Sequence, residues 1–233
     1  MISQIFTRSK KKVRKIQFFT TFLIISLGFY AAINDQADKM AYFIPNFISS
    51  AIAKEKNTSK TQEEKILAIK KAAKGFFANM RFADTPYDMG QLSFKDIQGK
   101  DHKLAEFSGK PILVNLWAIW CLPCRTEMPE LAQLKREMGG ENFDVIAINV
   151  DNTGSFTKIQ NFLHDTHADD LVYYRDTTMN IFKNVRRQLL ALGLPITFLV
   201  DKNSHLIASF NGAAPWGNDD AKAFIKSVIQ EIQ

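Results

Sequence analysis

From about residue 87 onward, short apolar runs alternate with segments whose apolar residues recur at helical spacing. The runs Pro111–Trp117 and Phe143–Val150 are almost continuously apolar, which is typical of strands covered on both faces of a sheet. The order of elements is βαβ followed by a ββα end, which predicts an α/β domain with a mixed sheet flanked by helices. We expect strands at 92–97, 111–117, 143–150, 171–174, 196–200 and 206–210, and helices at 104–107, 122–138, 156–164, 181–190 and 221–232.

The N-terminal segment has a different pattern. A basic stretch, residues 1–15, precedes the uncharged apolar run Ile16–Ile33. As a helix this run would be about 27 Å long, close to the roughly 30 Å of a bilayer's hydrocarbon core. Positive charges before it and Asp35 and Asp38 after it favour a cytoplasmic N-terminus. We therefore expect a transmembrane anchor at 16–34, with the rest of the chain on the extracytoplasmic side of the membrane. A cleaved signal peptide is the alternative, but its apolar core would be shorter and no good small-x-small cleavage site follows.

Residues 35–86 connect the predicted anchor to the α/β domain, which we place at 87–233. Residues 35–60 are polar and mixed, without a sustained period, and predict a tether. The pattern changes at Thr61, where a capping box begins. Apolar residues then recur at helical spacing as far as Met80. We expect this amphipathic helix to dock on the domain.

The formal charge of +6 comes from the N-terminal residues. Residues 1–15 hold six of the 30 basic residues and no acid, so the rest has 24 basic and 24 acidic residues and no net charge. A neutral domain lacks the Lys and Arg excess of a phosphate-binding surface, which argues against nucleic-acid binding. Two cysteines are too few for a disulfide scaffold. No third ligand accompanies the pair His164 and His167, so neither a metal site nor a cofactor is expected.

The two cysteines, Cys121 and Cys124, lie directly after a predicted buried strand and directly before a predicted helix. At the helix N-terminus, unpaired N–H groups and the helix dipole favour a thiolate, which makes Cys121 the expected nucleophile. Cys124, one turn further on, would resolve a mixed disulfide. Pro123 suits the first turn because it has no N–H to leave unpaired. Two close cysteines also fit a structural disulfide or half a metal site, but the strand, Trp120 and the helix favour catalysis.

Four motifs, in order, resemble those of thioredoxin-like proteins. They are Leu113–Pro129, which contains the cysteine pair, Asp144–Asp151, Gly193–Asp201 and Gly212–Trp216. The similarity extends from Gln91 to the C-terminus. It is strongest to the TlpA/ResA branch of membrane-anchored bacterial thiol-disulfide oxidoreductases, in particular to its TlpA-like members. The resemblance implies a thioredoxin-like fold and thiol-disulfide exchange, with the anchor in a bacterial inner membrane and the domain in the periplasm.

The resemblance also implies roles for residues around the cysteine pair. Pro195 stands where this superfamily has a cis proline opposite the cysteines, and Leu194 before it would pair with an extended client segment. Asn115 replaces the buried aspartate of thioredoxin, whose general-base role an amide cannot take. TlpA/ResA-like proteins instead have a glutamate three residues after the second cysteine, here Glu127. It could accept the resolving thiol's proton if desolvation raises its pKa, and a helix-surface glutamate is the alternative.

A client-contacting surface is expected from the residues next to the nucleophile. Trp120, Leu122 and Pro123 would form it together with Leu194, and Trp120 would also shield the thiols. Trp117 and Trp216 fit either a core or a surface position, and the sequence does not choose between them.

The expected direction of exchange comes from the resemblance alone. TlpA/ResA-like proteins reduce oxidised cysteine pairs and are recharged by a membrane thiol transporter, so we expect a reductase. The implied clients are copper-site cysteines of cytochrome oxidase and its copper chaperone, which we favour, or haem-binding cysteines of apocytochrome c. A dithiol oxidase, a copper-binding metallochaperone and an adaptor with an inert disulfide are the alternatives. Nothing in the sequence indicates an oligomer, and a monomer is expected.

Overall fold

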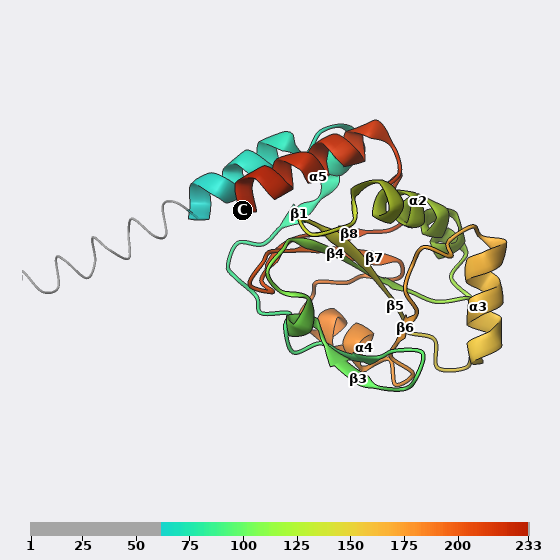
Figure 1. Cartoon of the computed structure of the whole chain (residues 1–233). Helices are drawn as coiled ribbons and strands as arrows, with labels where there is room; N and C mark the ends of the chain where they lie inside the picture. Colours follow the sequence, from blue (N-terminus) through green and yellow to red (C-terminus); the bar gives the residue numbers. More distant parts are fainter. Residues whose placement is uncertain (1–61, 233) are drawn as a thin grey trace, which may run out of the picture. The chain divides into compact units, whose positions relative to one another are not determined.

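A computed structural model describes residues 62–232, and a mixed eight-stranded sheet runs through it (Figure 1). The strand order is β1-β8-β7-β4-β5-β6-β2-β3. The central strand β4 pairs in parallel with β5 and antiparallel with β7. The strands are β1 (Arg81–Phe82), β2 (Ser93–Lys95), β3 (Asp101–Lys103), β4 (Ile112–Trp117), β5 (Asp144–Asn149), β6 (Tyr174–Arg175), β7 (Ile196–Val200) and β8 (Leu206–Asn211).

The central strands form because their sequences can be buried on both faces. Every residue of β4 and β7 is buried, and so is every residue of β5 after the first. Apart from Asn115, Thr197 and the two ends of β5, their residues are apolar, so little solvation of polar side chains is lost when helices cover both sides of the sheet. The predicted mixed sheet flanked by helices is confirmed.

More helices cover one face of the sheet than the other. Side chains of α2 (Leu122–Met138), α3 (Phe156–Asp165) and α5 (Asp219–Ile232) pack into one apolar core with residues of the sheet. On the opposite face a second core includes α4 (Asn180–Arg187) and the 3-10 helix η2 (Leu104–Phe107). Figure 1 shows α2 and α5 on one side of the sheet and α4 on the other.

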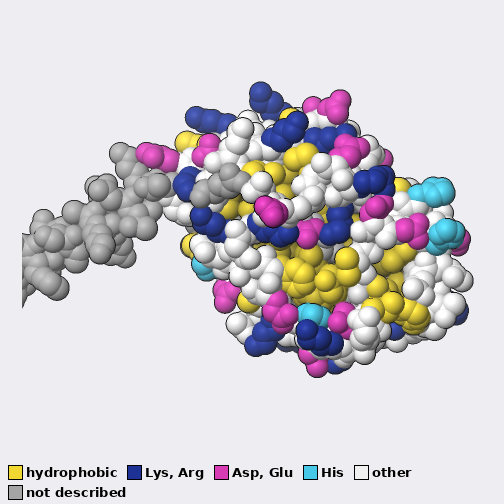
Figure 2. Space-filling model, in the orientation of Figure 1, with side chains coloured by type: hydrophobic (Ala, Val, Ile, Leu, Met, Phe, Trp, Pro, Cys, Tyr) yellow, Lys and Arg dark blue, Asp and Glu magenta, His cyan; other side chains and the backbone are white. Residues whose placement is uncertain are grey.

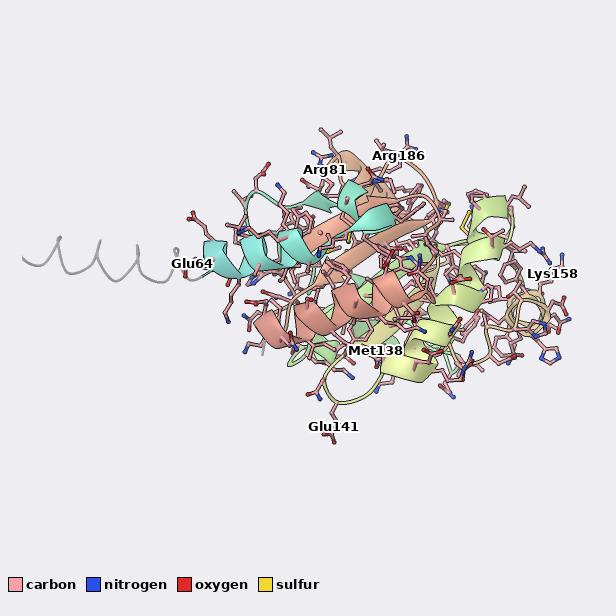
Figure 3. All side chains as sticks on the ribbon, turned by 90° about the horizontal axis from the view of Figure 1, so that it is seen from above. Glu64, Arg81, Met138, Glu141, Lys158 and Arg186 are labelled. Carbon is pink, nitrogen blue, oxygen red and sulfur yellow. A yellow bond between two sulfur atoms is a disulfide. The ribbon has the colours of Figure 1, made fainter. Side chains whose placement is uncertain are left out.

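The segment before the sheet forms two short helices. Residues 62–72 are helical, and the 3-10 helix η1 (Gly75–Asn79) follows. The predicted continuous helix to Met80 is wrong because Gly75 has φ +57°, which an α-helix excludes. Phe77 is fully buried against α5, where its ring stacks on Phe224 with centroids 5.9 Å apart. Seen from above, α5 lies between the helix of residues 62–72 and α2 (Figure 3).

Three short elements differ from the sequence-based expectation. Strand β3 was not predicted, because its pairing with β2 is accompanied by polar contacts rather than by an apolar pattern. The ring of His102 lies between the carboxylates of Asp96 and Glu106, with nitrogen–oxygen distances of 3.0 and 2.8 Å. Strand β6 lies later than predicted, and α4 ends earlier. On the loop that follows α4, Leu189 and Leu192 are exposed, whereas Ala191 is buried.

Part of the predicted organisation lies outside the described residues. This holds for the basic tail at 1–15, the membrane anchor at 16–34 and the tether up to residue 61. Among the helices of residues 62–232, none combines the length and the apolar character needed to cross a bilayer. Residues 62–86, predicted to lie between tether and domain, belong to the same compact unit as the sheet.

Candidate active site

The cysteine pair occupies the start of α2, directly after the central strand β4. Cys121 is the N-cap residue of α2 and forms a disulfide with Cys124, with Cα atoms 5.3 Å apart. The Sγ of Cys121 accepts a hydrogen bond from the backbone N–H of Cys124 at 3.2 Å. The same N–H also donates to the backbone oxygen of Cys121 at 3.1 Å. It belongs to the first turn of α2, at the positive end of the helix dipole, so it would equally stabilise a Cys121 thiolate in the reduced protein. Figure 3 shows the disulfide at the end of α2 opposite Met138.

The surroundings of the disulfide are apolar and exposed on one side. Cys121 is 4% exposed and Cys124 is fully buried, so Cys121 is the sulfur that a client can reach. Trp120 is 59% exposed and Leu122 is 75% exposed. Pro123 is exposed as well. These side chains present an apolar surface next to the accessible sulfur.

The loop before β7 reaches the same end of the sheet. The Leu194–Pro195 peptide bond is cis, as predicted. Ile196 pairs with Leu116 near the end of β4 that leads into the cysteine pair. Pro195 is buried, and Leu194 is partly buried where the two apolar cores meet.

Asp151 holds the turn that leads from β4 to the cysteines. Its carboxylate accepts hydrogen bonds from Thr153, from the backbone of Gly154 and from the backbone of Ile119. Burial acts to raise the pKa of Asp151, but these hydrogen bonds outweigh it and hold the pKa below its ordinary value. The Asp151 loop therefore fixes the backbone immediately before Trp120.

The carboxylate of Glu127, one turn along α2 from Cys124, is buried and receives three hydrogen bonds. Oε1 accepts from the indole N–H of Trp216 at 2.7 Å and from the backbone N–H of Ala214 at 3.1 Å. Oε2 accepts from Nδ2 of Asn115 at 2.9 Å. Because Glu127 is only 1% exposed, the helix-surface alternative is wrong.

Burial determines the acidity of Glu127. Desolvation of the ionised form raises its pKa from 4.5 to about 7, while the hydrogen bonds from Trp216, Ala214 and Asn115 act in the opposite direction. An acid with a pKa near neutrality can both accept and release a proton at physiological pH. Cys124 lies three residues before it on the same helix, a spacing at which side chains are neighbours.

The raised pKa predicts a pH dependence of stability. The folded protein keeps the Glu127 proton up to about pH 7, whereas the unfolded chain releases it near pH 4.5. The contribution of this proton is therefore complete below pH 4.5 and is lost as pH rises through 7, a change on the order of 3 kcal/mol. Urea unfolding of the wild type and of Glu127→Gln at both ends of this range measures it. Equal pH dependence of the two proteins would contradict the prediction.

Sequence reasoning missed two members of this site, Asn115 and Trp216. Asn115 was set aside because an amide cannot act as a base, yet its Nδ2 donates to Glu127 and also to Oγ1 of Thr197 at 2.9 Å. Trp216, which the sequence left between core and surface, is fully buried and bonded to the same carboxylate. A polar residue inside the apolar run of β4 was the one available signal, since buried polar groups need partners.

The disulfide lies away from the hollows of the described surface. One hollow, of about 280 Å³, lies between β2 and the start of α4. The other, of about 540 Å³, lies between the β2–β3 turn, α3 and β6. Figure 2 shows apolar side chains gathered in the middle of one face of the molecule, with Lys, Arg, Asp and Glu interspersed around them. None of the residues that line these two hollows belongs to the cysteine segment or the Pro195 loop. Within residues 62–232 no cluster of three His, Cys, Asp or Glu side chains could hold a metal ion.

Similar proteins and structures share this fold. The thiol-disulfide oxidoreductase ResA of Geobacillus thermodenitrificans is 26% identical over 174 residues, which cover 70% of this chain and 92% of the relative. The thioredoxin-like protein YneN of Bacillus subtilis is 29% identical over 114 residues, 48% of this chain and 62% of the relative. A structure described as a DsbE thiol:disulfide interchange protein from Chlorobium tepidum has a TM-score of 0.51 at 23% identity, covering 64% of this chain and 99% of its own, and supports the fold alone.

A thioredoxin-like sheet with a Cys-x-x-Cys disulfide at the N-terminus of the helix after its central strand defines a thiol-disulfide oxidoreductase. Residues 84–225, more than half of the chain, match the Redoxin family. The chain belongs to the Redoxin family, and its relatives include ResA-type oxidoreductases.

Proposed function

We propose that this oxidoreductase reduces the cysteine pairs of oxidised client proteins on the periplasmic side of a bacterial inner membrane. One observation carries the proposal. A buried carboxyl group with a pKa of about 7 lies one helical turn from the inaccessible sulfur of a disulfide whose other sulfur borders an exposed apolar surface. This arrangement separates an attacking sulfur, Cys121, from a resolving sulfur, Cys124, that has its own proton acceptor, Glu127.

The reaction proceeds in two exchanges. The Cys121 thiolate attacks one client sulfur, the client disulfide breaks, and its other sulfur leaves as a thiolate that takes a proton from water. Cys124 then transfers its proton to Glu127 and attacks the Sγ of Cys121. The mixed disulfide breaks, the second client sulfur leaves, and the Cys121–Cys124 disulfide forms. The second client sulfur leaves as a thiolate and is protonated in turn, and Glu127 releases the proton of Cys124 to water. Counting also the proton that Cys121 lost when it ionised, the client gains two electrons and two protons and the cysteine pair loses the same.

The client contacts the apolar surface around Cys121. Trp120, Leu122 and Pro123 surround the sulfur from the α2 side, and an extended client segment pairs with the backbone of Leu194 next to Pro195. Supporting this arrangement, β7 begins beside the end of β4, so both sets of residues lie at one end of the sheet. The exposed apolar side chains of Trp120 and Leu122 beside the sulfur suit contact with a protein substrate.

The chain acts from the membrane in this proposal. An anchor at 16–34, preceded by a cytoplasmic basic tail, confines the enzyme near membrane-bound clients and raises their effective concentration. The clients are copper-site cysteines of cytochrome oxidase and its copper chaperone, or haem-binding cysteines of apocytochrome c. A membrane thiol transporter returns two electrons to the Cys121–Cys124 disulfide after each cycle. The sequence supports this location, and the ResA-named relatives support the exchange chemistry.

The reduction potential of the Cys121/Cys124 couple tests the proposed direction. We expect a value near that of thioredoxin, about −270 mV, when the full chain is equilibrated in dithiothreitol buffers. Such a couple donates electrons to client disulfides. A value near that of a strong oxidant, about −120 mV, would reverse the direction and make the protein a disulfide donor. Tight copper binding by the reduced pair would instead favour the metallochaperone alternative.

A further inference from the structure

Trp216 is the one aromatic side chain that donates a hydrogen bond to the Glu127 carboxylate among the contacts described here. Its indole N–H lies 2.7 Å from Oε1, the shortest of the three hydrogen bonds to this group. We propose that Trp216 is a positioning residue for the exchange reaction, because its indole N–H holds the Glu127 carboxylate in place one helical turn from Cys124. This inference rests on the proposed role of Glu127 as the proton acceptor of Cys124.

The position of the indole is itself fixed by packing. Trp216 is fully buried. Its ring lies 4.9 Å from that of Phe77, which comes from η1, and 6.3 Å from that of Phe210 at an interplanar angle of 83°. A side chain enclosed in this way has one accessible rotamer, so its N–H cannot turn to another acceptor.

The loop that contains Trp216 is fastened to α2 at two points. Glu127 accepts from the backbone N–H of Ala214 as well as from the indole, and Glu130, one turn further along α2, accepts from the backbone N–H of Gly217 at 2.9 Å. The loop therefore follows α2 as a unit. The Glu127 carboxylate is held between this loop on one side and β4 on the other, where Asn115 donates to its second oxygen.

The groups that donate hydrogen bonds to the carboxylate carry no full charge of their own. From β4, β7 and the loop after β8, the groups that face it are Asn115, Thr197, Ala214 and Trp216. On α2 itself, Cys124 lies one turn before it and Glu130 one turn after. The acidity of Glu127 is thus set by burial, which raises its pKa, against neutral donors that lower it. Removal of one donor destabilises the ionised form and leaves the burial unchanged.

The test compares the resolving step in three variants across pH. Reduced full-length protein is mixed with dithiobis-nitrobenzoate. Cys121 releases the first nitrothiophenolate, and Cys124 releases the second when it displaces the mixed disulfide. The rate of the second release is followed by stopped-flow absorbance from about pH 5 to about pH 9. The variants are Trp216→Phe, Glu127→Gln and the matched control Trp117→Phe.

Trp117 is a suitable control because it is equally buried but differs at the N–H. It is 2% exposed and stacks on Phe162 at 5.0 Å, and its Nε1 has no hydrogen-bond partner among the described residues. Trp117→Phe therefore removes the same atoms from the same apolar core without removing a hydrogen bond to Glu127. Any general effect of a smaller ring on packing appears in both variants.

We expect the rate of the second release to rise with pH in the wild type, with an inflection near pH 7. This inflection should be absent from Glu127→Gln. Trp216→Phe should move this inflection upward by about one pH unit, since a hydrogen bond to a charged group stabilises it by about 1.5 kcal/mol or more and one unit corresponds to about 1.4 kcal/mol. Trp117→Phe should leave the inflection in place. A Trp216→Phe profile that coincides with those of the wild type and Trp117→Phe would overturn the inference alone.

The result for Glu127→Gln tests the proposed function as well as this inference. If Glu127→Gln kept the wild-type inflection, Glu127 would not be the proton acceptor, and both its proposed role and this inference would fall. If Trp216→Phe does not fold, site-specific replacement of Trp216 by benzothienylalanine answers the same question. That residue has the shape of Trp with sulfur in place of the N–H, so an unshifted inflection in this protein overturns the inference and an upward shift supports it.

Discussion

Replacement of Glu127 by Gln is expected to slow the release of reduced client about 100-fold near neutral pH, the lower end of the usual contribution of a positioned general base. Cys124 is fully buried, so water cannot readily take its proton, and the carboxylate one turn away is the acceptor that the fold provides. The first exchange, in which Cys121 attacks, should keep its wild-type rate. Rapid-quench trapping of the mixed disulfide separates the two steps, and the variant should accumulate it.

Gln is a suitable replacement because the surrounding groups can accommodate an amide. Its oxygen can accept from Trp216 and Ala214, as the carboxylate does. Its N–H₂ would face Nδ2 of Asn115. Rotation of the Asn115 amide would present Oδ1 to it but would move Nδ2 to the buried position where Oδ1 has no partner among the described residues. This costs stability, which the urea-unfolding comparison of the two proteins measures, whereas a slowing confined to the second exchange reflects the chemistry.

Glu130→Gln is the matched control for this experiment. Glu130 lies one turn further on the same helix and accepts a hydrogen bond from the same loop, through the N–H of Gly217. A Gln there keeps an acceptor oxygen and removes the same charge, so its rates should stay close to those of the wild type. If both variants slowed the second exchange equally, the loss would come from the attachment of the loop to α2 and not from proton transfer by Glu127.

The sequence predicted the long buried elements well because local pattern and burial agree there. Strand β7 has the predicted bounds, Ile196–Val200, since it is a fully buried run between Pro195 and the turn that begins at Asp201. Strand β6 is different. It has two residues and meets β2 at the single pair Lys95 and Arg175, so no periodic pattern marks it.

The site was predictable only as far as it is local in sequence. The cysteine pair can be identified from its spacing and from the predicted strand and helix on either side of it. The state of Glu127 depends on Ala214 and Trp216, which lie 87 and 89 residues away in the sequence. Burial of the carboxylate, and with it the raised pKa, results from packing of the loop after β8 onto α2. No helical period indicates such a contact, and the same period also fits a surface glutamate.

Cys124→Ser is expected to convert the enzyme into a trap for its clients. Cys121 keeps its position at the N-cap of α2 and its hydrogen bond from the backbone N–H of residue 124, so it still attacks a client disulfide. A serine hydroxyl at position 124 cannot displace the mixed disulfide, because exchange requires a thiolate. Turnover should fall below detection, and a covalent complex should accumulate that reductant dissolves.

Cys121→Ser is the paired variant, and it should form no complex. Cys124 is buried beneath the first turn of α2, so its thiol is out of a client's reach in the folded protein. In each variant one sulfur atom is replaced by oxygen and the disulfide is lost. The two variants differ only in which cysteine remains. Non-reducing electrophoresis after mixing with an oxidised client protein distinguishes them. A complex of equal yield from both would mean that either sulfur can attack, and the division into a nucleophile at the protein surface and a fully buried resolving thiol would then be wrong.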